Sequence, residues 1–246
     1  MIKELKDLLT IIKNRTVIFT ILIIFIGSLP AIFDVYLLDA NFYNQLLACF
    51  TSNFHITMLF LLVFLNIISL SKQYKISAFI LKYKNYQTYL KGILKKCLLY
   101  LNLTLLISLI LCLFFAWVSV DYKITIIPFQ LYNISNLEYL IFYMIRVLIY
   151  LNLLTMIFFY CNQRFGTKIT FLLLLFLILG EFMPIFPFNS STGIIPKAFF
   201  IFNFFKITPY STFLLEITAS FIQLLLLIGI FFLMRYLAIF KRKENL

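Results

Sequence analysis

Long apolar runs alternate with short polar segments along this chain. They lie near 17–38, 47–70, 97–119, 137–160, 168–187 and 213–238. A transmembrane α-helix needs about 20 consecutive, mostly apolar residues. Each run therefore predicts one membrane-spanning helix. The run at 47–70 is the least regular, because its outer part, TSNFHIT, is polar. The pattern predicts an all-α integral membrane protein with six transmembrane helices.

The composition supports this fold class. The 246 residues are 63% hydrophobic and only 12% charged, and the mean hydropathy is +1.03. Soluble domains carry about 25% charged residues, and one globular core could not bury this much apolar material. We expect a single transmembrane domain over residues 1–246.

The distribution of lysine and arginine predicts which side of the membrane each loop occupies. Seventeen of the 21 basic residues fall in the termini and in the loops on the same side as the termini. The opposite loops hold only Lys123, Lys197 and Lys206, and Arg146 lies within the fourth run. The positive-inside rule then places both termini in the cytoplasm. The net charge of +12 follows from this topology and from anionic lipid headgroups, so no nucleic-acid partner is predicted.

Two segments outside the spans have patterns of their own. Residues 1–15 predict an amphipathic helix in the inner interface, although a charged flank that continues the first span is the alternative. Residues 188–212 follow Pro184 and Pro187, which should break the fifth helix. They are rich in phenylalanine and predict a re-entrant or interfacial extracellular segment.

The groups that intramembrane enzymes need are missing from the sequence. His55 is its one histidine, and no GxSxG or GxxxxGK[ST] motif occurs. The nine acidic residues are scattered singly, and the four cysteines form no CxxC pair, which favours buried free thiols. We expect no enzyme activity, no metal and no cofactor on this chain.

Charges inside the spans are costly and indicate candidate sites. Arg146 in the fourth run and Glu181 in the fifth lie at similar distances from the predicted cytoplasmic boundary. An Arg146–Glu181 ion pair is therefore possible, either to fix helix registry or to line a substrate path or subunit seam. His55, in the polar outer part of the second run, is a third candidate for such a path or seam.

A basic stretch, SLSKQYKISAFILKYKNYQTYLKGILKKC, joins the second and third runs. It holds seven lysines and no acidic residue. The apolar side chains of Ile76, Phe79, Ile80 and Tyr83 recur through it at helical spacing. A loop that needed only to be cytoplasmic would not need this apolar face.

This ordering of parts resembles the ABC-2-type permease subunits of bacterial ABC exporters. The matching parts are the interfacial helix MIKELKDLLTIIK, the basic loop with its short amphipathic helix, the broken aromatic segment before the last span and the short basic tail. The resemblance implies that residues 72–91 form a cytoplasmic coupling loop that docks on a separate ATPase subunit. The implied contact residues are Lys75, Ile76, Ser77, Phe79, Ile80, Lys82, Tyr83 and Lys84.

The resemblance also implies the partners. They are two ATPase subunits that carry ATP and Mg, a second identical or similar permease, and a peptide or other hydrophobic substrate moved across the bacterial plasma membrane. Two alternatives stay open from the sequence. One is a stand-alone small membrane transporter, which should carry more polar residues near mid-membrane. The other is a non-transporting immunity or sensor protein.

Overall fold

A computed structural model describes residues 42–51, 53–73, 86–119, 132, 134–182 and 212–243 of this chain. Its helices are α3 (Phe42–Thr51), α4 (Asn53–Gln73), α6 (Tyr86–Ser119), α7 (Asn136–Phe165), α8 (Thr167–Phe182) and α10 (Phe213–Lys243). Within the described ranges, three helical stretches are long and apolar enough to cross a membrane: Gln87–Phe114, Asn136–Phe165 and Phe213–Ile239. Shorter apolar helices cover Thr57–Ile68 and Thr167–Leu179. The fold and these apolar helices agree with an all-α membrane protein.

The helices differ from the predicted spans mainly at their ends. The run at 97–119 belongs to α6, which begins eleven residues earlier, at Tyr86. Leu90, Ile93 and Cys97 lie three and four residues apart and are buried, so the amphipathic face continues past the apolar run. The intervening lysines are good helix formers, and Lys91 and Lys95 are exposed on the opposite side of the helix.

The run at 47–70 falls on α3, which ends at Thr51, and on α4, which begins at Asn53; residue 52 lies outside the described residues. The predicted interfacial helix (1–15), the first span (17–38) and the segment 188–211 lie outside the described residues. In the predicted coupling loop, residues 72–73 end α4 and residues 86–91 begin α6. The remaining part, 74–85, also lies outside the described residues and contains every implied ATPase-contact residue.

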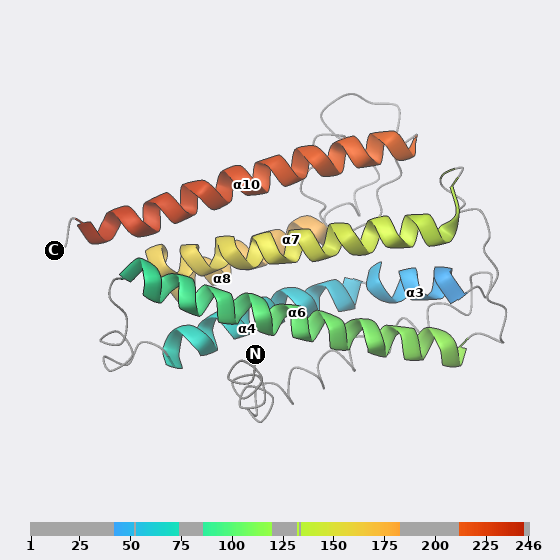
Figure 1. The fold of residues 1–246 in the computed structure, drawn as a ribbon, viewed down its shortest axis with the longest axis horizontal. Helices are drawn as coiled ribbons and strands as arrows, with labels where there is room; N and C mark the ends of the chain where they lie inside the picture. Colours follow the sequence, from blue (N-terminus) through green and yellow to red (C-terminus); the bar gives the residue numbers. More distant parts are fainter. Residues whose placement is uncertain are drawn as a thin grey trace.

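The helices lie roughly side by side along one direction (Figure 1). α4, α7 and α10 run one way, α6 and α8 run the other way, and α3 leads into α4. α7 is the central helix, since it packs against α3, α4, α6, α8 and α10. Because α10 packs mainly on α7, the contact between these two helices decides how α10 is held.

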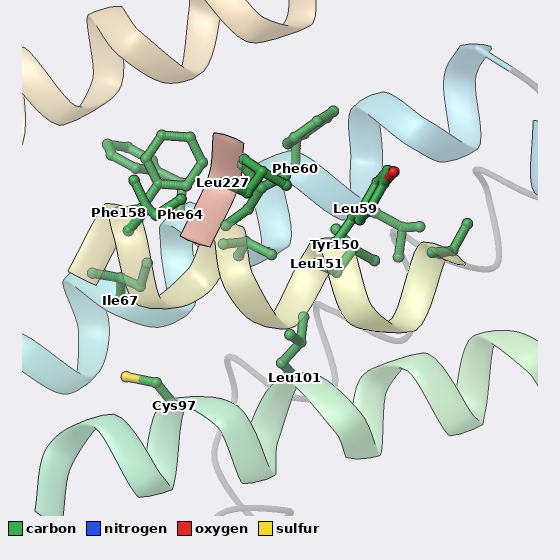
Figure 2. Close-up of a cluster of buried hydrophobic side chains, with 14 of the residues drawn as sticks. Leu59, Phe60, Phe64, Ile67, Cys97, Leu101, Tyr150, Leu151, Phe158 and Leu227 are labelled. Carbon is green, nitrogen blue, oxygen red and sulfur yellow. The ribbon is translucent and has the colours of Figure 1, made fainter. Parts of the chain in front are cut away.

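The core forms where α4, α6 and α7 meet (Figure 2). Phe60 and Ile67 of α4 are at most 1% exposed, and Leu151 of α7 is fully buried. A polar bond also links α4 to α6, because Asn66 Nδ2 donates to the carbonyl oxygen of Cys97 at 3.2 Å. Such interhelical hydrogen bonds replace part of the hydrophobic driving force that helices lack in lipid.

Both ends of α7 are set by local sequence. At its start, the backbone N–H of Glu138 donates to Ser135 Oγ at 3.2 Å, and the backbone N–H of Ser135 donates to Glu138 Oε2 at 2.9 Å. This capping box satisfies two backbone donors. At its end, Gly166 takes φ +84° and ψ 174°, a region that is essentially restricted to glycine. The chain reverses there and α8 begins at Thr167.

Charge is distributed unequally along the bundle. The helix termini that meet at one end of the bundle, at the left of Figure 1, carry most of the basic residues of the described ranges. We call this the basic end; its residues are Lys72, Lys91, Lys95, Lys96, Arg164, Lys168, Arg235, Lys241, Arg242 and Lys243. The acidic residues of the same ranges, Glu138, Glu181 and Glu216, lie away from it.

Candidate polar site between α7 and α10

One face of α7 carries polar and aromatic side chains at helical spacing, and α10 presents a matching row. Residues three and four apart lie on the same face of a helix. On α7 the row is Tyr139, Tyr143, Arg146 and Tyr150; on α10 it is Glu216, Ser220 and Gln223. The two rows meet near the helix starts, far from the basic end.

A buried ion pair forms the centre of this contact. Arg146 Nη1 lies 2.7 Å from Glu216 Oε1, and the two side chains are 4% and 0% exposed. The hydroxyl of Tyr139 donates to the same carboxylate oxygen at 2.9 Å. Charged side chains within a bilayer are expensive unless they pair. Here the guanidinium neutralises the carboxylate, and the tyrosine adds a charge-assisted hydrogen bond.

Aromatic rings surround the pair. Arg146 Cζ lies 5.2 Å from the ring centroid of Tyr143 and 5.7 Å from that of Phe142, within the range of cation–π attraction. The ring of Phe213, at the start of α10, contacts Phe142 and Tyr139 at centroid distances of 5.2 and 6.2 Å. The ion pair therefore sits in an aromatic, low-dielectric environment, where its electrostatic attraction is strengthened.

A second polar link lies one helical turn further along the contact. The hydroxyl of Tyr150 lies 2.7 Å from the carbonyl oxygen of Ser220 and 2.8 Å from Gln223 Oε1. We call the side chains of Tyr139, Arg146, Tyr150, Glu216 and Gln223 the polar seam. All five are buried, so the seam binds the two helices in one register.

One carboxylate oxygen of the polar seam is able to bind a further donor or cation. Glu216 Oε2 is buried and has no hydrogen-bond partner among the described residues. A buried carboxylate oxygen favours a hydrogen-bond donor or a cation. Within the described ranges, no group of three or more His, Cys, Asp and Glu side chains is arranged to hold a metal ion.

Of the site residues predicted from the sequence, Arg146 is the one whose side chain the structure describes, and it lies in this seam. The side chains of Glu181, on α8, and His55, on α4, lie outside the described set. Arg146 precedes the end of α7 by 19 residues, and Glu181 follows the start of α8 by 14. At ~1.5 Å per residue, their depths differ by about 7 Å. The Arg146–Glu181 pair stays a prediction, while Glu216 is the carboxylate that the structure brings to Arg146.

Sequence reasoning did not select Glu216. Arg146 follows the first residue of α7 by ten positions, whereas Glu216 follows the first residue of α10 by only three. In the sequence, Glu216 therefore looks like a residue at the end of a span and not one inside it. The contact between the two residues implies that α10 begins about 10 Å further along the bundle than α7, at ~1.5 Å per residue. The sequence does contain a pattern that could have indicated Glu216. Glu216, Ser220 and Gln223 form a polar row at helical spacing within an apolar span.

The fold and the seam define a class: an all-α membrane protein with a charged pair buried between two apolar helices. Comparisons of the chain with known protein families, with curated proteins and with solved structures find no match.

Proposed function

We propose that this chain is the transmembrane subunit of an ATP-driven exporter, similar to ABC-2-type permeases. It would have six spans and cytoplasmic termini in a bacterial plasma membrane. The observation that carries the proposal is that α4 ends and α6 begins at the basic end. Residues 74–85 join these two ends in sequence, and the positive-inside rule assigns the basic end to the cytoplasm.

In this proposal, segment 74–85 and its flanks couple the permease to a separate ATPase. Ile76, Phe79, Ile80 and Tyr83 would enter an apolar groove of that subunit as a helix-in-groove contact. The neighbouring lysines would meet acidic residues at the rim of the groove or lipid phosphates. ATP and Mg would bind to the partner.

The proposed assembly also contains a second permease, identical or similar to this chain. α10 supports this part of the proposal, because much of its surface is apolar and exposed: Leu214, Phe221 and Phe232 are 73%, 58% and 57% exposed. Such a surface suits lipid and equally suits another apolar helix. The substrate proposed is an amphipathic peptide or another hydrophobic compound, which would leave along a path between the permeases.

A specific observation favours a second candidate, a stand-alone membrane transporter. Such proteins bind ligands at polar groups buried between helices, and the polar seam with its buried carboxylate oxygen is such a feature. This candidate predicts that the purified chain acts without an ATPase, whereas the exporter proposal predicts a stable ATPase complex.

The two candidates are separated by purifying the tagged chain from its native host in mild detergent. The exporter proposal predicts that an ATPase with a phosphate-binding loop co-purifies. A variant with Phe79→Asp and Ile80→Asp should lose that ATPase and still insert into the membrane, because charge would enter an apolar groove.

The matched control adds the same two charges at positions that helical spacing puts opposite the apolar face, as Ala78→Asp and Asn85→Asp, and should retain most of the ATPase. Recovery of the chain alone with transport activity intact would refute the exporter proposal. Equal ATPase recovery in all variants would show that the coupling surface lies elsewhere.

A further inference from the structure

A small pocket lies at the basic end, where α6, α7 and α10 meet. It is a shallow, partly open hollow, and its lining comes from Gln87, Leu90, Lys91, Tyr160, Arg235 and Ile239. The apolar stretches of α6 and α10 end at Gln87 and Ile239. The pocket is therefore placed at the level where a bilayer changes from acyl chains to headgroups.

The chemistry of this lining is that of an anion site. Lys91 and Arg235 supply two cations from different helices, and Gln87 and Tyr160 add an amide and a hydroxyl. None of the lining residues carries a carboxylate. Tyr160 is held in place by the ring of Phe231, whose centroid is 6.0 Å away.

We propose that this pocket binds the phosphate headgroup of an anionic membrane lipid. Lysine and arginine form strong charge-assisted hydrogen bonds with phosphate oxygens, and basic pockets between transmembrane helices bind anionic headgroups. The hollow is too small to enclose a ligand, so a phosphate would lie at its mouth and the acyl chains would remain outside. Phe232 lies three residues before Arg235 on the same side of α10 and is 57% exposed, so it offers apolar surface for those chains.

A lipid bound here would have a structural effect. α10 packs mainly on α7, whereas Lys91 and Arg235 lie on α6 and α10. One phosphate between them would connect these two helices at the basic end. The lipid would thus hold α10 at the end opposite the polar seam.

The test uses the full-length chain in an uncharged detergent, with native mass spectrometry and thermal unfolding as readouts. The probes are short-chain phosphatidylglycerol, short-chain phosphatidylcholine and inorganic phosphate. We expect one retained phosphatidylglycerol, a higher unfolding temperature with that lipid than with phosphatidylcholine, and no displacement by an equal concentration of inorganic phosphate. Displacement at equal concentration would identify free phosphate as the ligand and overturn the lipid assignment.

The variant Lys91→Gln with Arg235→Gln should weaken phosphatidylglycerol binding about thirty-fold (about 2 kcal/mol). The control, Lys95→Gln with Lys168→Gln, removes the same charge from exposed residues of the basic end that do not line the pocket. It should change binding by less than about threefold, since screened surface charges contribute little. An equal loss of phosphatidylglycerol affinity in both variants would show that the lipid is attracted by the overall positive charge of the basic end and not by a specific site. If the pocket double variant does not fold, either single variant with unchanged affinity would overturn the proposal.

Discussion

The contact between α7 and α10 has two dissimilar halves. Toward the helix starts it is the polar seam, with the Arg146–Glu216 pair at 2.7 Å. Toward the basic end it is apolar and aromatic: Leu227 is 2% exposed, and Phe231 packs on Tyr160. We call this second part the apolar half.

The difference shows how two helices are joined inside a protein that lies in lipid. Apolar contacts add little driving force there, because lipid tails are as apolar as leucine. Close packing in the apolar half therefore contributes shape complementarity between the two helices. The directional bonds of the seam select one register. A shift of α10 by one turn would preserve much apolar contact but would separate Glu216 from Arg146.

Removing one charge of the seam should give the largest effect. Arg146→Leu or Glu216→Leu leaves an uncompensated buried charge, which typically costs 3–5 kcal/mol, on the order of total stability. The double variant removes both charges and should recover most of that loss. Unfolding in mixed micelles of dodecyl sulfate and an uncharged detergent would measure these differences.

Glu181→Leu is the informative control for this experiment. If Glu216 is the main partner of Arg146, Glu181→Leu should cost less than about 1 kcal/mol, within the ordinary range for a single substitution. A loss equal to that of Glu216→Leu would show that the carboxylate predicted from sequence also serves Arg146. A double variant as unstable as the single ones would contradict the pairing itself.

The next largest effect should come from a cavity in the apolar half. Leu227→Ala removes a side chain that is 2% exposed and should cost about 2 kcal/mol, at the low end for buried leucine. Leu225→Ala, on the same helix but 52% exposed, should cost less than about 0.5 kcal/mol. Equal losses at the two positions, measured by the same unfolding method, would show that the apolar half is not closely packed.

The spans were predictable because the bilayer imposes a length and a composition on each helix. The runs at 137–160 and 213–238 fall within α7 and α10 for this reason. The start of α6 at Tyr86 was not predicted from hydropathy. Lys91 and Lys95 on the exposed face of this first part of the helix lower its mean hydropathy. Its buried face, Leu90, Ile93 and Cys97, was visible only as helical periodicity.

Half of the candidate site was predictable. Arg146 is conspicuous as a charge in the middle of an apolar span, whereas Glu216 stands near the start of one. Choosing between Glu181 and Glu216 requires the axial offset and the neighbours of each helix. Those are properties of side-chain packing between helices, which the apolar pattern of a single chain does not encode.

The smallest effect should come from the second polar link of the seam. Tyr150→Phe keeps the ring and removes only the hydroxyl that lies 2.7 Å from the Ser220 carbonyl and 2.8 Å from Gln223 Oε1. Interhelical hydrogen bonds in membrane proteins average about 0.6 kcal/mol and reach about 1.7 kcal/mol, so we expect a loss near 0.6 kcal/mol.

Repeating Tyr150→Phe in a Gln223→Leu background isolates the side-chain contact from the bond to the backbone. If Gln223 is the main acceptor, the tyrosine variant should lose much less stability in that background than alone. An unchanged loss would assign the hydroxyl to the Ser220 carbonyl, which any residue at position 220 provides. The seam would then owe its side-chain specificity to the ion pair and Tyr139, and register would depend on the first turn of α10.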